Sequence, residues 1–167
     1  MTDFMEAAMR HALRVFSLLA PLGLAACGGG GNSEPEASGP TERLPLGAGQ
    51  VAKLEAEPFI NSMPGIFDPK SPCQNFIVPV RLLMLEGTLP AGIAFGAVSL
   101  RSGPDEVWRA QAAASEQYVH QGGLHGVARA CANARTPVGR TVRVVAEVIS
   151  GGGTKQVYAD AVIGEAH

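Results

Sequence analysis

The stretch TVRVVAEVI, residues 141–149, alternates apolar and polar side chains. In an extended chain Arg143 and Glu147 fall on one face. The other face carries four aliphatic side chains: Val142, Val144, Ala146 and Val148. Alternation with a period of two is typical of a β-strand with one buried face. The stretch therefore predicts a strand whose aliphatic face belongs to the core.

A partner for this strand follows directly in the sequence. Residues 150–154 form a glycine-rich turn segment, and alternation resumes over 156–163. Its apolar side carries Val157, Ala159, Ala161 and Ile163. Two alternating runs joined by such a turn predict a β-hairpin at the C-terminus.

Four more strands are expected further upstream. Residues 76–85, FIVPVRLLML, are apolar on both faces, as in a central strand, although Pro79 lacks an N–H and requires an edge, a bulge or a strand start. Residues 93–101 predict a strand with Gly96 as a possible bulge. The other two strands are expected at 50–59 and 125–133.

Residues 105–119, DEVWRAQAAASEQYV, allow two interpretations. Pro104 before two acidic residues suits a helix N-terminus, and the alanines and glutamines are good helix formers. All neighbouring segments look like strands, however, and tertiary context often overrides propensity. The segment is therefore either an inserted helix or a hairpin of two strands around 113–116.

Composition and strand count together set the fold class. The chain has 167 residues, of which 46% are apolar and 17% charged, as expected for one globular domain. Its 21 glycines and 12 prolines favour many turns over a bundle of long helices. Six or seven short strands predict a mainly β fold, a β-sandwich that could be immunoglobulin-like, with one possible inserted helix at 105–119.

The N-terminal residues read as an export signal. Residues 10–27, RHALRVFSLLAPLGLAAC, combine two arginines, an apolar run and small residues before a cysteine. The apolar run covers 15–26 and is shorter than the roughly 20 residues that a membrane-spanning helix needs. Acidic residues precede the arginines, and a start at Met9 would leave them out. Residues 1–26 are therefore expected to be a signal peptide.

The end of this signal, Leu24 to Cys27, resembles the lipobox of bacterial lipoproteins. The resemblance covers residues 1–27 only. It implies cleavage before Cys27, a thioether-linked diacylglycerol on its sulfur and an acyl chain such as palmitate on its new amino group. Gly28, in place of aspartate, implies the outer membrane, with the domain facing the periplasm. The alternative is an ordinary secretory signal cleaved near Ala26, with an incidental cysteine.

A tether separates this anchor from the domain. Residues 28–43, GGGGNSEPEASGPTER, carry no large apolar side chain and cannot offset the entropy of ordering. Residues 27–43 are therefore expected to be a lipidated cysteine with a flexible tether, and 44–167 a single β-rich periplasmic domain. In that compartment disulfides persist, so Cys73 and Cys131 are expected to pair; two separate buried thiols are the alternative.

Charge and motifs argue against several function classes. The net charge is −2 and the basic residues form no cluster, so we expect no nucleic-acid partner, and we expect a monomer. Gly47, Gly49 and Ala52 match the letters of a dinucleotide fingerprint. That fingerprint needs a preceding buried strand and a following helix, neither of which is predicted, so no cofactor is expected.

Two histidines offer a candidate site. His120 and His125 flank a glycine loop and could bind a transition metal if Glu116 joined them. Either histidine could also act as a base for Ser115 or Ser99 in hydrolysis. The alternative is two solvent-facing loop histidines, and no GxSxG, SxxK or HExxH motif is present.

The larger aromatic residues leave a similar choice. Trp108, Tyr118 and Tyr158 could form an exposed recognition patch or lie in the core.

These observations favour a non-enzymatic function. We expect a lipid-anchored cell-envelope protein whose β-sandwich binds or scaffolds an unknown envelope protein or ligand. One alternative is an inhibitor of a periplasmic hydrolase that inserts residues 120–126 into its target. Another is a metal-binding or hydrolytic domain that uses His120 and His125.

Overall fold

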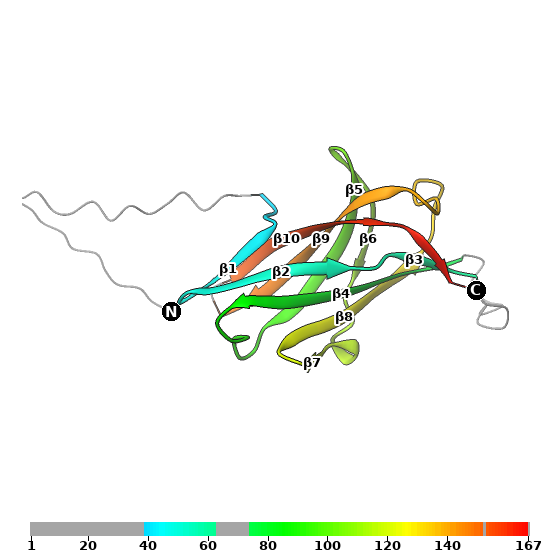
Figure 1. Cartoon of the computed structure of the whole chain (residues 1–167). Helices are drawn as coiled ribbons and strands as arrows, with labels where there is room; N and C mark the ends of the chain where they lie inside the picture. The colour runs from blue at the N-terminus through cyan, green and yellow to red at the C-terminus, as the bar shows by residue number, and fades with distance from the viewer. Residues whose placement is uncertain (1–38, 63–73, 152, 167) are drawn as a thin grey trace, which may run out of the picture. The chain divides into compact units, whose positions relative to one another are not determined.

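The protein is a β-sandwich. The computed structural model describes residues 39–62, 74–151 and 153–166, and Figure 1 shows two mainly antiparallel sheets packed face to face. The described part of the chain contains these elements: β1(Arg43–Gly47), β2(Gln50–Ala56), β3(Phe59–Asn61), β4(Asn75–Glu86), β5(Ala94–Ser102), β6(Asp105–Gln111), the 3₁₀ helix η1(Ala114–Glu116), β7(Tyr118–His120), β8(Gly123–Cys131), β9(Thr141–Ser150), β10(Gly153–Val162) and β11(Gly164–Ala166). The predicted sandwich is confirmed, and its immunoglobulin-like form stays a prediction. None of the helices in these residues is long and apolar enough to cross a membrane.

The larger sheet has seven strands and is built around β4. β2 and β3 pair in succession along one edge of β4, and β8 pairs along the other edge. β1 extends the sheet beyond β2, β11 extends it beyond β3, and β7 extends it beyond β8. The predicted strands at 50–59, 76–85 and 125–133 all belong to this sheet, and 50–59 divides into β2 and β3.

The smaller sheet has the order β10-β9-β5-β6. β9 and β10 form the predicted C-terminal hairpin, paired from Thr141↔Val162 to Ser150↔Gly153. The side chains of Val142, Val144, Ala146 and Val148 are buried, as the alternation predicts. The register between β5 and β9 shifts between Phe95 and Val98, which confirms the bulge expected at Gly96.

Pro79 lies in the middle of β4, and none of the three expected positions accounts for it. Its carbonyl accepts a hydrogen bond from the Glu57 N–H at 3.1 Å, so its nitrogen faces the same edge. Along this edge β2 ends at Ala56 and β3 begins at Phe59. The neighbouring strand is therefore interrupted at the position where Pro79 has no N–H to donate. No ladder hydrogen bond is lost there.

Residues 105–119 are neither an inserted helix nor a hairpin. β6 pairs with β5 in the smaller sheet, whereas β7 pairs with β8 in the larger sheet. The segment therefore crosses from one sheet to the other through η1. The segment is extended although its residues favour a helix, because the extended backbone places Val107 and Trp108 in the core. The free energy of burying these apolar side chains outweighs small differences in helix propensity.

The two sheets are joined along both sides. On one side, Thr41 bridges to Val157 of β10, next to β1. Pairing thus begins at Thr41, so the last residues assigned to the tether are part of the fold. On the other side, Ala112 bridges to Ala128 of β8. The chain also passes from β10 to β11 at the buried Ile163.

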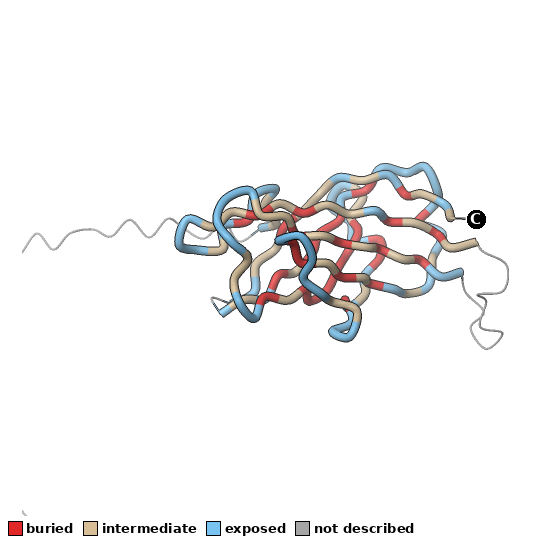
Figure 2. Tube along the Cα trace, turned by 60° about the horizontal axis from the view of Figure 1, so that its bottom comes forward, coloured by how far each residue is buried: buried red, intermediate tan, exposed pale blue. Residues whose placement is uncertain are grey.

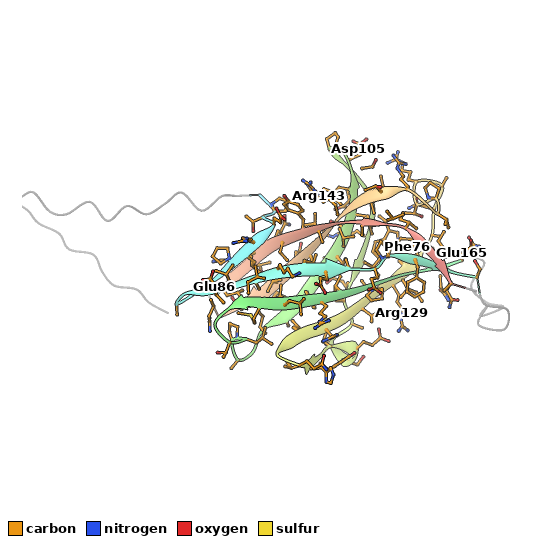
Figure 3. The ribbon with its side chains drawn as sticks, viewed as in Figure 1. Phe76, Glu86, Asp105, Arg129, Arg143 and Glu165 are labelled. Carbon is orange, nitrogen blue, oxygen red and sulfur yellow. The ribbon has the colours of Figure 1, made fainter. Side chains whose placement is uncertain are left out.

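The core lies between the inner faces of the sheets (Figure 2). Along β4 the inner residues are fully buried while their neighbours on the outer face keep part of their surface. Phe76 of β4 packs edge-to-face on Trp108 of β6, with ring centroids 5.1 Å apart. Figure 3 labels Phe76 near the start of β4. The buried side chains of the core include Leu44, Leu54, Phe76, Val78, Val80, Leu82, Phe95, Val98, Leu100, Trp108, Val144, Val148, Val157 and Ile163.

Candidate functional site

The two histidines lie side by side on the outer face of the larger sheet. The His120 ring, on β7, lies 6.0 Å from the His125 ring, on β8, between centroids. They flank a tight two-residue turn in which Gln121 and Gly122 have φ of 49° and 73°, the positive φ values of the turns that favour short hairpins. Residues 120–126 are therefore a β-hairpin and no protruding loop.

Glu116 does not join the histidines. Its carboxylate forms an ion pair with Arg129 at 3.1 Å. No group of three or more metal-binding side chains occurs among residues 39–62, 74–151 and 153–166. The three-ligand site considered from the sequence is therefore not formed by the described residues.

The two serines are not placed alike. Ser99 is 5% exposed and belongs to β5 of the smaller sheet, so it does not share a sheet with the histidines. Ser115 is exposed in η1. The larger sheet thus does not bring Ser99 to a histidine base.

The three large aromatic side chains do not form one patch. Trp108 is buried in the core, and its indole N–H donates to the Cys131 carbonyl at 3.1 Å. Tyr158 lies on β10 beneath the Arg143 guanidinium, 3.9 Å from the ring centroid. Tyr118 is 58% exposed on the larger sheet. Only Tyr118 of the three is thus both exposed and next to the histidines.

The GAGQVA motif is a hairpin turn. Gly47, Ala48 and Gly49 have φ of 99°, 48° and 74° and connect the antiparallel strands β1 and β2. The glycines meet the demand of this turn for positive φ. No helix follows them in the described chain, so the fingerprint's phosphate-binding geometry is absent there.

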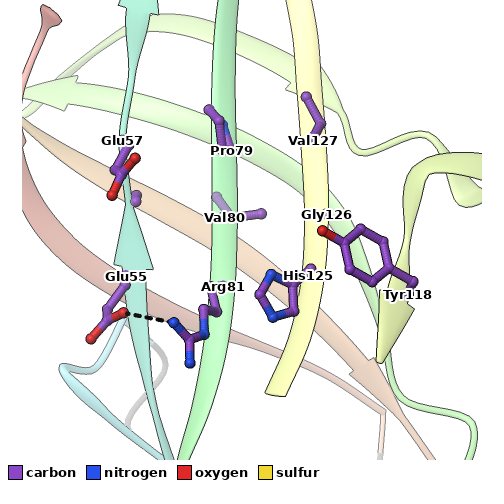
Figure 4. A pocket seen from close by; sticks show the side chains of 10 residues that line it. Glu55, Glu57, Pro79, Val80, Arg81, Tyr118, His125, Gly126 and Val127 are labelled. Carbon is purple, nitrogen blue, oxygen red and sulfur yellow. Dashed lines mark ion pairs between the residues drawn. The ribbon is translucent and has the colours of Figure 1, made fainter. Parts of the chain in front are cut away.

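A row of polar and aromatic side chains crosses four strands of the larger sheet. Glu55 of β2 pairs with Arg81 of β4, Arg81 with His125 of β8, and His125 with Tyr118 of β7. Residues directly opposite one another point to the same face of a sheet. Figure 4 shows this sequence of side chains from Glu55 to Tyr118. We call these four residues the cross-strand row.

A shallow cavity of about 200 Å³ lies over this row (Figure 4). Its apolar part includes Pro79 and Val127, and its polar part comes from the cross-strand row and Glu57. The Tyr118 and His125 rings stack with centroids 5.0 Å apart and planes 9° apart. The cavity therefore combines a flat aromatic surface with hydrogen-bond donors and acceptors.

Two nitrogen atoms of the row lack hydrogen-bond partners. Arg81 Nε and His125 Nε2 are buried and have no hydrogen-bond partner among the described residues. The Arg81 guanidinium reaches Glu55 only at 4.0 Å, while Lys53 contacts Glu55 at 2.9 Å. Buried polar atoms normally have partners. This face of the sheet therefore keeps hydrogen-bonding capacity that the described protein does not use.

Gly123 lies at the edge of the row, beside Leu82 of β4. A Cβ at this position would crowd the Leu82 carbonyl oxygen at 3.0 Å, whereas its 3.6 Å distance to Arg81 Nε would be an ordinary contact. The glycine thus allows β8 to approach β4 closely at the edge of the row.

On the outer face of the smaller sheet several charges pair with one another, although the buried Arg101 Nε has no partner among the described residues. Arg143 donates to both carboxylate oxygens of Asp160, at 2.9 and 3.1 Å. Arg109 contacts Glu147 at 2.7 Å and Glu106 at 3.4 Å. These bonds raise the pKa of both arginines and lower that of Asp160.

A second cavity lies where β2 and β10 meet. Arg143 already pairs with Asp160 of its lining and covers the Tyr158 ring, whose centroid lies 3.9 Å from the guanidinium. The cavity over the cross-strand row is therefore the better candidate site.

The Arg143–Asp160 pair gives the smaller sheet a pH dependence. Because the folded-state pKa of Asp160 is lowered, its stabilising effect is present above the unfolded-state pKa and is lost as the pH falls through the folded value. We expect Asp160→Asn to reduce the fall in melting temperature between about pH 5 and pH 2 by a few degrees at most, since exposed ion pairs contribute little. Thermal unfolding at each pH measures this. An unchanged acid dependence in the variant would contradict the assignment.

Comparison with known proteins gives no family for this chain. No protein-family model, no curated protein and no solved structure matches it. Its function has to be inferred from its own residues.

His120, His125 and Tyr118 were singled out from the sequence, whereas Glu55 and Arg81 were not. The signal for Glu55 was the alternation in 50–59, and the signal for Arg81 was that it is the one charged residue of the apolar run 76–85.

The cysteines lie mostly outside the described residues. Cys27 and Cys73 are not described, so lipidation and the partner of Cys131 stay predictions. Cys131 itself is disulfide-bonded and lies at the end of β8.

Proposed function

We propose that this protein is a lipid-anchored component of a bacterial cell envelope whose β-sandwich binds another envelope component without catalysis. The lipobox-like residues that end at Cys27 support the anchor. Gly28, in place of aspartate, supports the outer membrane as its location, with the domain facing the periplasm on a tether.

The cross-strand row is the observation that carries the binding function. It gathers aromatic, cationic and anionic side chains around one cavity on an open sheet face. On the other outer face Arg109 and Arg143 each pair with a carboxylate. Shallow cavities with a few convergent polar groups are typical of binding sites.

The outer face of the larger sheet, which carries the cross-strand row, is partly apolar. Ile77, Pro79 and Leu83 of β4 point outward and remain half-buried, as does Val127 of β8. Apolar residues on both faces predicted a central strand covered on both sides, yet the described residues place no second layer on this face. A bound partner would cover it.

Site-specific photo-crosslinking tests the binding function. A photoreactive amino acid at Tyr118 should give adducts in cells that produce the protein. The same amino acid at Tyr158, on the outer face of the smaller sheet, is the matched control and should give far fewer. Equal yields at the two positions, or no adduct at either, would reject the cross-strand row as the binding face.

Anchoring depends on Cys27. We expect Cys27→Ala to abolish palmitate incorporation and to prevent lipid-dependent membrane attachment, because stable anchoring takes more than one acyl chain and all of them require this residue. Radiolabelled palmitate and membrane fractionation measure the two effects. Labelling of the variant at the level of the natural protein would refute the lipoprotein assignment.

A further inference from the structure

We propose that the ligand of the cross-strand row is a neutral glycan, bound by one or two sugar units at the cavity between β2, β4, β8 and β7. This inference rests on the proposed function and names the class of ligand for that site.

The size and form of the cavity point to one small unit of a longer ligand. At about 200 Å³, it is smaller than the roughly 300–1,000 Å³ of sites that enclose whole small molecules. It is also continuous with the exposed surface of β7, whose three residues are all exposed. A chain of ring-shaped units can place one unit in the cavity and continue over the open face.

The aromatic pair suits the apolar face of a sugar ring. Tyr118 and His125 lie parallel to within 9°, and Tyr118 remains 58% exposed although it stacks on His125. An aromatic face carries partial negative charge and attracts the weakly positive C–H groups that line one side of a pyranose. Pro79 and Val127 extend this apolar surface within the cavity.

The polar groups suit hydroxyl groups, which donate and accept at the same time. The Glu55 and Glu57 carboxylates accept hydrogen bonds, and the Arg81 guanidinium donates them. All three side chains line the cavity. Neighbouring hydroxyls of a sugar could satisfy an acceptor and a donor of this set together.

The charge balance argues for a neutral ligand. Arg81 and Lys53 lie 4.0 and 2.9 Å from the Glu55 carboxylate, so the two positive charges share one close negative charge. Glu57 adds a further exposed carboxylate to the lining. An anionic ligand would meet both carboxylates, and a cationic ligand would meet Arg81, so either would be repelled by part of the site.

Calorimetric titration tests this inference. The full-length lipidated protein, purified in lauryldimethylamine oxide, a detergent without a sugar headgroup, is titrated with chitotetraose, cellotetraose and maltotetraose. Inorganic phosphate and trialanine are the anionic and peptide comparison probes. We expect saturable binding of at least one tetrasaccharide, with a Kd on the order of 1 mM or tighter, and no binding of the comparison probes.

Matched variants locate the binding. Tyr118→Ala should weaken the binding of the sugar by about three- to tenfold, the loss expected for one aromatic contact. Arg81→Met should weaken it as well, while Tyr158→Ala on the other sheet should not. The emission of Trp108 reports whether each variant remains folded, because this buried residue is the chain's one tryptophan.

The outcomes separate this inference from the proposed function. No binding of any tetrasaccharide, stronger binding of phosphate or trialanine, or sugar binding that survives both Tyr118→Ala and Arg81→Met would overturn the glycan assignment. If crosslinking at Tyr118 still gave a specific adduct, the binding function would stand with a different ligand. If neither position crosslinked specifically, the proposed function would fail as well.

Discussion

Replacement of Phe76 by alanine is expected to lower the free energy of unfolding by about 3–5 kcal/mol. The Phe76 side chain is 0% exposed and packs edge-to-face on Trp108 at 5.1 Å, so the variant loses both apolar burial and an aromatic pair. Domains are typically stable by only about 5–15 kcal/mol. Urea unfolding followed by the emission of Trp108 measures the change.

Phe59→Ala is the matched control for this substitution. Phe59 is also a phenylalanine of the larger sheet, but it is only half-buried in the short strand β3. Its loss should cost clearly less than the loss of Phe76, with the denaturant slope unchanged in both variants. Equal costs for the two substitutions would contradict the full burial of Phe76 in the core.

Strand positions were predictable wherever one face of the strand is buried. In 141–149 and 156–163 the alternation determines which side chains face the core, and β9 and β10 follow it. The three-residue strands β3, β7 and β11 were not predicted as elements because they are too short for a pattern. Their existence depends on partners far away in the sequence.

The path of residues 105–119 depends on such distant partners. The Gln117 carboxamide accepts from the Phe95 N–H at 2.8 Å and donates to the Phe95 carbonyl at 3.0 Å. Its NH₂ group also donates to the Ala112 carbonyl at 3.1 Å. One side chain thus pairs with the backbone of β5 as a strand would and holds η1 in place. Local helix propensity carries no information about this contact.

The candidate site was predictable only in parts for the same reason. Alternation could place Glu55 and Arg81 on outer faces, but it could not place them opposite each other. Their meeting depends on the register of β2 on β4, and the meeting of Arg81 with His125 depends on the register of β4 on β8. A shift of one residue in either ladder would turn the partner to the other face. Register is a property of the packed sheets.

Reduction of the disulfide at Cys131 is expected to lower stability by about 4 kcal/mol. We predict Cys73 as its partner, which closes a loop of about 58 residues, and the chain-entropy model assigns that much to a loop of this length. The described ladder supports the pairing: Asn75 lies opposite Cys131, and the Ala132 N–H donates to the Gln74 carbonyl at 2.9 Å. Cys73 precedes Gln74 directly in the sequence. Urea unfolding with and without a reductant measures the loss.

Thiol counts under denaturing conditions separate this pairing from the alternatives. The natural protein should show no reactive thiol before reduction and two after it, because the Cys27 sulfur carries lipid. Cys27→Ala should also show none before reduction, whereas pairing of Cys131 with Cys27 would leave two reactive thiols in that variant. The double variant Cys73→Ala, Cys131→Ala should lose about the same stability as the reduced protein and should not respond to reductant. Two reactive thiols in the unreduced natural protein would end the prediction, since the seam between the start of β4 and the end of β8 would then hold without a covalent link.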